Sequence, residues 1–211
     1  MNYPVIILGA GGHAKVLIDI LLLNSIKILF ATDPDPLKMD QAILEIPIMG
    51  GDDEVMKYPF ESVHLVNGVG SICVSPLRRQ LFERFKSLGY QFSNVIHSSA
   101  IVSSVVVMNE GTQIMAGVVV QAGCFIGRNT IINTHATVDH DCHIGDHTHI
   151  APGVTLSGGV KIGENSHIGA GATVLQGIEI GRDCLVAAGA VVIRDIPDGA
   201  IMAGIPAKHL R

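Results

Sequence analysis

Residues 114–149 read IMAGVV VQAGCF IGRNTI INTHAT VDHDCH IGDHTH, and each group of six begins with an aliphatic side chain. The same period of six runs without interruption from Ile96 to Val192. Four residues after each aliphatic residue comes a second position that is always small or β-branched, such as Cys124, Thr130 or Ala136. An α-helix needs apolar residues every three or four positions and a simple strand every two, so neither alone explains the pattern.

A period of six is typical of a short strand followed by a corner. Three such units make one triangular coil, and successive coils stack at about the 4.8 Å spacing of paired strands. The aliphatic residues are expected to point into the prism, and the small residues are expected to fit its tight corners. We therefore predict a β-helix over residues 93–211.

The sequence before residue 93 has a different pattern. We expect strands at Val5–Leu8, Ile28–Thr32 and Ser62–Asn67, and helices at Lys15–Leu23 and Pro76–Ser87. Ser75 is the expected N-cap of the second helix, and Gly89 follows its end. Because strands and helices alternate, residues 1–92 are predicted to form a small parallel α/β sheet.

Composition excludes several functions. The formal net charge of −5 does not favour nucleic-acid binding, which needs a clustered basic surface. His13, Lys15 and Asp19 interrupt the first apolar run, so we expect neither a signal peptide nor a membrane span. The four cysteines show no C-x-x-C spacing, and reduced thiols in a cytoplasmic protein are the expected state.

A glycine loop follows the first expected strand. Gly9-x-Gly11-x-x-Ala14 matches the dinucleotide-binding fingerprint, and Asp33 lies about where a ribose-binding acid would be. Such glycines let backbone N–H groups approach a phosphate at a helix N-terminus. Because this region is long enough for only half of a dinucleotide fold, a single nucleotide is favoured over NAD. A tight turn without a ligand is the alternative.

His140 is a candidate general base within the repeat. Residues eighteen apart stack in columns, so His140 is expected between Ala122 and Gly158, whose small size leaves room for a substrate. A carboxylate of Asp139 or Asp141 bonded to one ring nitrogen would raise the basicity of the other. Alternatively, these are solvated polar residues on the outer face of the prism.

A smooth column of small residues continues from Asn133 through Ala151, Gly169 and Ala187, and it could hold the thin arm of an acyl carrier. His149 is expected to stack beside His167 in a neighbouring column. The cysteines of the repeat occupy the small interior position, where a thiol acts as a compact hydrophobe, so we expect no covalent cysteine intermediate.

The two halves together resemble the nucleotide-sugar acetyltransferases related to the sialic acid O-acetyltransferases. Members include N-acetyltransferases of UDP-linked 4-amino sugars and of GDP-perosamine. The residues that carry the resemblance are Gly9-Ala10-Gly11-Gly12-His13, the loop at Asp33, Asn133, His140-Asp141, His149, Leu156-Ser157-Gly158-Gly159 and Ala203-Gly204-Ile205-Pro206-Ala207-Lys208. The resemblance covers essentially the whole chain. It implies a Rossmann-like domain followed by a left-handed parallel β-helix.

The resemblance also implies roles for individual residues. His140 would be the general base and Asp141 would raise its basicity. Acetyl-CoA would contact His149, Gly158, Ala170 and Ala188. The acceptor would be held by Gly11, Gly12, His13, Asp33 and Gly68, with Asn133 also on the substrate side. Relatives can carry a second acid directly after the first, whereas Pro34 stands there in this chain, which puts base recognition by this loop in doubt.

The implied enzyme is a cytoplasmic homotrimer with each active site between neighbouring β-helices, and it needs no metal. It would acetylate the amine of a nucleotide-linked amino sugar, most often a 4-amino sugar. O-acetylation of a sialic acid or another sugar is the nearest alternative. A zinc carbonic-anhydrase-like β-helix is another, since His135 and His140 have the right spacing, although Ser99 stands where its third histidine would lie. The third alternative is a non-catalytic protein that senses nucleotides or serves in assembly.

Overall fold

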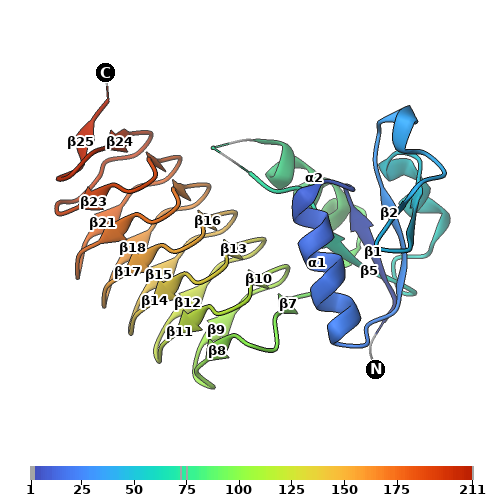
Figure 1. Ribbon diagram of the computed structural model, residues 1–211, viewed down its shortest axis with the longest axis horizontal. Coiled ribbons are helices and arrows are strands. Elements are labelled where there is room, and N and C mark those ends of the chain that lie inside the picture. Colours follow the sequence, from blue (N-terminus) through green and yellow to red (C-terminus); the bar gives the residue numbers. More distant parts are fainter. Residues whose placement is uncertain (1–2, 72, 75, 211) are drawn as a thin grey trace. The chain divides into compact units, whose positions relative to one another are not determined.

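The computed structural model describes residues 3–71, 73–74 and 76–210, and the chain divides into two compact units (Figure 1). Of the described residues, 3–71 and 76–98 belong to the first unit, and 73–74 and 99–210 belong to the second. The sequence placed the boundary after Phe92. The strand β7 (Val95–Ile96) is counted with the first unit, where the Asn24 side chain donates a 2.9 Å hydrogen bond to the carbonyl of Ile96.

The first unit is built around a six-stranded sheet with the order β3-β4-β2-β1-β5-β6. Its strands are β1 (Val5–Leu8), β2 (Ile28–Thr32), β3 (Ala42–Ile43), β4 (Ile46–Met49), β5 (His64–Asn67) and β6 (Gln91–Phe92). Neighbouring strands are parallel except for β3, which pairs antiparallel with β4. The central β1 is buried along its whole length, which explains its unbroken apolar sequence. The predicted Rossmann-like parallel sheet is confirmed.

The helices of this unit are α1 (Gly12–Leu23), α2 (Pro76–Ser87) and the two 3₁₀ turns η1 (Pro36–Lys38) and η2 (Asp52–Lys57). The first helix therefore begins three residues before the predicted start at Lys15. The predicted N-cap Ser75 lies outside the described residues. Phe82 and Phe85 of α2 are fully buried and form part of the core.

The second unit is a parallel β-helix with three faces. Within this unit, the strands of the first face are β10 (Gln113–Ile114), β13 (Ile131–Ile132), β16 (His149–Ile150), β19 (His167–Ile168), β22 (Leu185–Val186) and β24 (Ile201–Ala203), and β25 (Lys208–His209) pairs antiparallel with β24 at the end of the sheet. The strands of the second face are β8 (Ile101–Val102), β11 (Val119–Val120), β14 (Thr137–Val138), β17 (Thr155–Leu156), β20 (Thr173–Val174) and β23 (Val191–Val192). The strands of the third face are β9 (Val107–Met108), β12 (Phe125–Ile126), β15 (His143–Ile144), β18 (Lys161–Ile162) and β21 (Glu179–Ile180). The predicted fold class, a left-handed parallel β-helix after a small α/β sheet, is confirmed.

The register of the strands is eighteen residues, so that Val119 pairs with Thr137 and His149 with His167. In the strands from β10 to β23 the second residue is buried, and Ile132 and Ile150 are fully buried. The small residue of the following turn is also buried, as Ala136 illustrates. The two positions of the period of six are thus the core of the prism.

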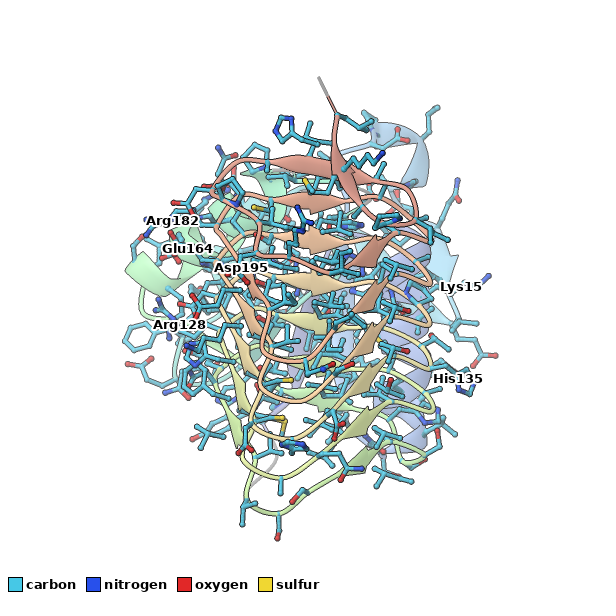
Figure 2. The ribbon with its side chains drawn as sticks, turned by 90° about the vertical axis from the view of Figure 1, so that its left-hand side faces the viewer. Lys15, Arg128, His135, Glu164, Arg182 and Asp195 are labelled. Carbon is cyan, nitrogen blue, oxygen red and sulfur yellow. The ribbon has the colours of Figure 1, made fainter. Side chains whose placement is uncertain are left out.

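Turns between successive strands form three corners, named here by the faces that they join: corner 1–2, corner 2–3 and corner 3–1. Figure 2 shows Arg128, Glu164 and Arg182 of corner 3–1 along one edge of the prism and His135 of corner 1–2 along another. In four successive coils of corner 3–1 the small interior residue carries a hydroxyl group that donates a hydrogen bond to a glycine carbonyl of the next coil. These pairs are Thr112 to Gly127, Thr130 to Gly145, Thr148 to Gly163 and Ser166 to Gly181.

Candidate active site

The glycine loop lies between β1 and α1. Gly11 is the N-cap of α1, and a Cβ atom at Gly11 or Gly12 would meet no atom within 4 Å. Gly9 has a φ of +96°, which favours glycine. The loop therefore presents the N-terminus of a twelve-residue helix to open space, as anion binding requires.

Asp33 follows directly after β2, beside this loop. Its Oδ2 accepts hydrogen bonds from the backbone N of Ala10 at 3.3 Å and from Nζ of Lys38 at 2.7 Å, and its Oδ1 accepts from the backbone N of Asp35 at 3.0 Å. Partial burial raises the pKa of Asp33. The hydrogen bond and charge of Lys38 and the two backbone hydrogen bonds lower it, and together they hold the pKa below that of an ordinary aspartate. Asp33 is thus a charged carboxylate that ties the end of β2 to the glycine loop.

Gly68 and His13 also lie near the carboxyl ends of the parallel strands, close to the glycine loop. A Cβ at Gly68 would lie 2.8 Å from Cγ2 of Ile7 and 2.9 Å from Cβ of Ala14, so close packing explains this glycine. A Cβ at Gly70 would lie 3.0 Å from Cβ of His13. The structure therefore brings together all five residues that were predicted to hold the nucleotide portion. They lie at the carboxyl ends of neighbouring parallel strands, where ligands bind in open α/β sheets.

His140 lies in the turn between β14 and β15, at corner 2–3. Its Nδ1 is 2.8 Å from Oδ2 of Asp141, and its backbone N donates a 2.8 Å hydrogen bond to Oδ1 of Asp139. An ionised carboxylate only accepts hydrogen bonds, so in the neutral imidazole Nδ1 carries the proton and Nε2 keeps its lone pair. The two side chains of the pair are 63% and 71% exposed, which leaves Nε2 accessible.

The backbone at this corner makes room for the pair. Asp141 has a φ of +59° at a position where the coils before and after carry Gly123 and Gly159. A Cβ on Gly123 would collide with the Asp141 carboxylate, and a Cβ on Gly158 would lie 2.6 Å from Cε1 and Nε2 of His140. The small neighbours predicted from the columns therefore support the carboxylate on one side and the imidazole on the other.

Two carboxylates raise the pKa of His140. The larger effect is the hydrogen bond to Asp141, followed by the charge of Asp139. Since the bond favours the protonated ring, Asp141→Asn is expected to lower the pKa of His140. The measurement is an NMR titration of the imidazole Cε1–H resonance. Asp139→Asn, which removes a charge but no bond to the ring, should lower it less, and an unchanged pKa in Asp141→Asn would contradict the pairing.

The other predicted acetyl-CoA residues lie elsewhere on the prism. His149 is on the first face, where its Nε2 is 3.2 Å from the side-chain N of Asn133 and its ring is 4.8 Å from that of His167. Asn133 belongs to corner 1–2, as do Ala170 and Ala188 in later coils. The second face separates this group from His140. Gly158 is the member of the predicted set that lies at His140 itself.

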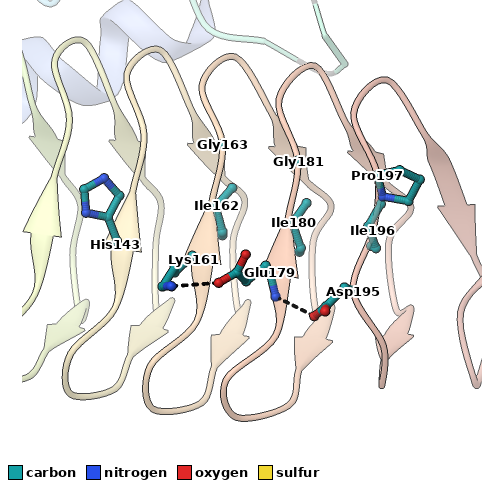
Figure 3. Close-up of a pocket in the computed structure, with 10 residues that line it drawn as sticks. All are labelled: His143, Lys161, Ile162, Gly163, Glu179, Ile180, Gly181, Asp195, Ile196 and Pro197. Carbon is teal, nitrogen blue, oxygen red and sulfur yellow. Dashed lines mark hydrogen bonds and ion pairs between the residues drawn. The ribbon is translucent and has the colours of Figure 1, made fainter.

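A groove of about 540 Å³ runs along the third face (Figure 3). It is lined by His143, Lys161, Glu179 and Asp195 among others. Lys161 pairs with Glu179 at 2.7 Å, and the backbone N of Glu179 donates to Asp195 at 2.9 Å. None of the predicted site residues lines this groove, and its lysine is paired with a carboxylate.

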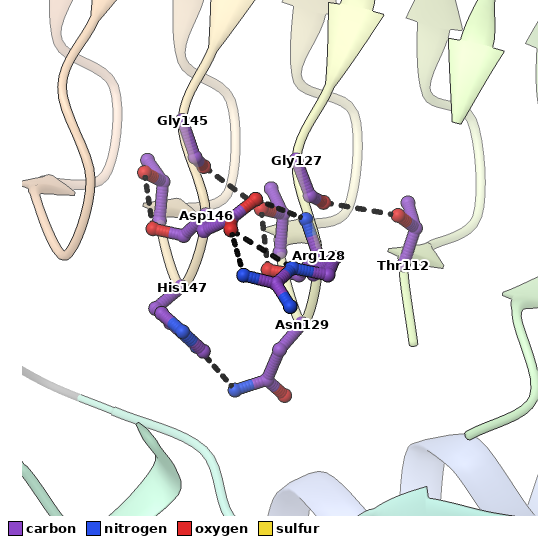
Figure 4. Close-up of polar contacts among 9 residues, drawn as sticks. Thr112, Gly127, Arg128, Asn129, Gly145, Asp146 and His147 are labelled. Carbon is purple, nitrogen blue, oxygen red and sulfur yellow. Dashed lines mark hydrogen bonds and ion pairs between the residues drawn. The ribbon is translucent and has the colours of Figure 1, made fainter. Parts of the chain in front are cut away.

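Corner 3–1 accounts for another histidine of the repeat (Figure 4). The Nδ1 of His147 is 3.0 Å from the side-chain N of Asn129, and both residues are buried. Arg128 forms a two-nitrogen contact with Asp146 beside them, at 3.0 and 2.8 Å. These contacts join one coil to the next and serve the stability of the prism.

Two charged residues beside Asp33 and Gly68 were not predicted from the sequence. They are Lys38, which pairs with Asp33, and Arg78, which binds backbone carbonyls beside Gly68. Among the described residues, no group of three or more His, Cys, Asp and Glu side chains is placed to hold a metal ion. Within the same residues, no helix is long and apolar enough to cross a membrane.

Two family models match the chain. The PglD N-terminal domain matches residues 4–85, and the bacterial transferase hexapeptide model of six repeats matches residues 123–158 and 159–194. No curated protein sequence matches the chain significantly.

Several solved structures are similar over the whole chain. Perosamine N-acetyltransferase from Caulobacter crescentus, solved as a histidine-to-asparagine variant with CoA and GDP-perosamine, is 39% identical, with 99% of this chain and 97% of that chain covered and a TM-score of 0.92. The acetyltransferase domain of PglB from Neisseria gonorrhoeae, in complex with acetyl coenzyme A, is 36% identical, with both chains covered completely and a TM-score of 0.93. WeeI from Acinetobacter baumannii, at 22% identity and a TM-score of 0.88, shares the fold. The chain thus belongs to the family of hexapeptide-repeat nucleotide-sugar acetyltransferases with a PglD-type N-terminal domain.

Proposed function

We propose that this chain transfers the acetyl group of acetyl-CoA to the amine of a nucleotide-linked amino sugar. The observation that carries the proposal is the His140–Asp141 pair, which leaves a basic Nε2 exposed above Gly158. The similar perosamine enzyme binds CoA and GDP-perosamine, and the PglB domain binds acetyl coenzyme A. The open glycine loop of the first unit supports an acceptor that carries phosphates.

In the proposed reaction the sugar amine attacks the thioester carbonyl directly. A C–N bond forms, the C–S bond breaks, and CoA leaves as the thiol or thiolate. His140 Nε2 accepts the proton that the amine loses, and Asp141 stabilises the imidazolium through Nδ1. A backbone N–H group of the corner would stabilise the developing oxyanion.

The nucleotide portion of the acceptor is assigned to the edge formed by Gly11, Gly12, His13, Asp33 and Gly68. The acceptor sugar is assigned as a 4-amino sugar, in line with the resemblance of the chain. The cytoplasm, where the free cysteines stay reduced, is the proposed compartment.

We further assign the active enzyme as a homotrimer. His140 lies at corner 2–3, whereas His149 and Asn133 lie on the first face and at corner 1–2. A site that uses both groups needs two copies of the chain, with corner 2–3 of one copy facing the first face of the next. Acetyl-CoA would then lie between neighbouring β-helices.

A thiol-release assay tests this function. Acetyl-CoA is offered with UDP-, GDP- and dTDP-linked 4-amino sugars and with free sialic acid, and light scattering measures the mass of the same preparation. We expect release with one nucleotide amino sugar and the mass of a trimer of 22.3 kDa chains. Release with sialic acid alone would favour O-acetylation. Nucleotide binding without release would favour a sensing protein, and a monomer would contradict the shared site.

A further inference from the structure

A buried guanidinium lies beside Gly68, at the edge to which the nucleotide is assigned. Arg78 of α2 is 4% exposed, and its Nη1 donates to the backbone carbonyls of Asn67 at 2.9 Å and of Val69 at 2.7 Å. Burial lowers the pKa of Arg78 to about 9, so the group still carries its charge at neutral pH. A buried charge is costly to desolvate, and these short bonds to carbonyls compensate for part of that cost.

Asn67 returns the contact. Asn67 is 1% exposed. Its side-chain Nδ2 donates a 2.9 Å hydrogen bond to the backbone carbonyl of Arg78, and its Oδ1 accepts a 3.3 Å hydrogen bond from the backbone N of Val69. On the other side, the backbone N of Gly68 donates a 2.8 Å bond to the carbonyl of Leu8 in β1. The segment 67–69 is therefore held between α2 and β1 at three successive residues.

The same segment borders the glycine loop. A Cβ on Gly9 would lie 3.2 Å from Cγ2 of Val69, and a Cβ on Gly68 would lie 2.9 Å from Cβ of Ala14. A Cβ on Gly70 would lie 3.0 Å from Cβ of His13. Any movement of the segment would therefore displace the loop residues that the proposed nucleotide contacts.

We propose that Arg78 is a positioning residue for nucleotide-sugar binding, acting through the segment 67–70. This inference rests on the proposed function. By fixing the segment before the ligand arrives, Arg78 removes the entropic cost of ordering the loop on binding. Arg78 should therefore affect the affinity for the nucleotide-linked acceptor and leave the affinity for acetyl-CoA unchanged.

The test compares Arg78→Met with Arg84→Met. Arg84 lies on the same helix, but its side chain is 44% exposed and its Nη2 pairs with Oδ1 of Asp53 at 2.7 Å. GDP, UDP and dTDP are titrated by calorimetry into each full-length protein, and steady-state kinetics follow. We expect Arg78→Met to bind the preferred nucleotide about tenfold to hundredfold more weakly, because two carbonyls lose a charged donor. The KM for acetyl-CoA should stay within about twofold of the wild-type value, and Arg84→Met should behave like wild type.

Arg78→Lys provides a conservative variant, since it keeps the charge but not the planar fork. Partial recovery of nucleotide affinity is expected, and no recovery of affinity relative to Arg78→Met would contradict a role for the charged donor. Nucleotide affinity unchanged in Arg78→Met would overturn the proposal and leave the proposed function intact. Failure of the wild type to bind any of the three nucleotides would overturn the proposed acceptor, and the role of Arg78 with it.

Hydrogen exchange of the wild type supplies a readout that does not depend on the folding of a variant. The amides of Gly68 and Val69 should already be protected without nucleotide, because both donate hydrogen bonds in the free protein. Fast exchange of these amides in the free protein, with protection only after nucleotide binding, would show that the segment is not held in advance. That result would also overturn the inference.

Discussion

His140→Ala is expected to lower kcat about 10²- to 10⁴-fold, the range for loss of a general base. The variant removes Nε2, which is the exposed basic atom at corner 2–3, and leaves Asp141 without its partner. Binding of the nucleotide is assigned to the other unit, so the KM of the nucleotide sugar should change little. The measurement is steady-state thiol release with the acceptor identified in the panel.

His143→Gln is the matched control for this variant. His143 is three residues further along the chain and stacks on Phe125 with a ring separation of 4.5 Å on the third face. It is exposed and makes no contact with the His140–Asp141 pair that the structure records. Equal losses in the two variants would point to disturbance of the coil, and retention of kcat in His140→Ala would remove this residue from the reaction.

Gly163→Ala should destabilise the β-helix without touching the proposed site. A Cβ at Gly163 would lie 2.5 Å from the backbone N of Arg182 and 2.6 Å from the carbonyl carbon of Gly181, and neither atom can move without shifting the next coil. Overpacking of this kind costs about 1–3 kcal/mol. For a chain of this size, each kcal/mol lowers the melting temperature by about 2–4 °C, which thermal unfolding would measure.

Gly171→Asn is the appropriate comparison. Gly171 has a φ of +67°, and a Cβ there would meet no atom within 4 Å. Asparagine tolerates this left-handed region better than most residues. We expect a smaller fall in melting temperature than for Gly163→Ala, and the reverse order would show that backbone conformation, not the contact between coils, sets the need for glycine in this repeat.

The coils of the β-helix and their register could be predicted because its contacts repeat along the sequence, whereas its left-handedness was implied only by the family resemblance. Each residue packs against the one eighteen positions away, so the period of six contains the register as well as the strands. The α/β unit follows no such period. Its β3–β4 hairpin turns at Leu44 and Glu45, which both have positive φ, and no glycine or asparagine marks this turn in the sequence.

The candidate site was predictable where its partners are adjacent in the chain, as for His140 and Asp141. Arg78 was missed because its partners are backbone carbonyls of another element, which no motif records. A signal was nevertheless present: Arg78 is three, four and seven residues before Leu81, Phe82 and Phe85, all buried, and this spacing places it on the core face of the helix. The sequence also allowed the separation of His140 from His149 to be predicted. The two histidines are nine residues apart, which is half of one eighteen-residue coil, so they lie on different parts of the prism.

The eighteen-residue register has a consequence for how this half of the chain can change in length. Insertion of a single residue within a coil would turn every later aliphatic side chain away from the interior, while a complete extra coil would leave all three corners in phase. Size variation among such prisms should therefore come in whole turns, each adding about 4.8 Å of height. The open coil near Val102 and Met108, where side chains are only partly buried, is the place where a further turn would disturb least.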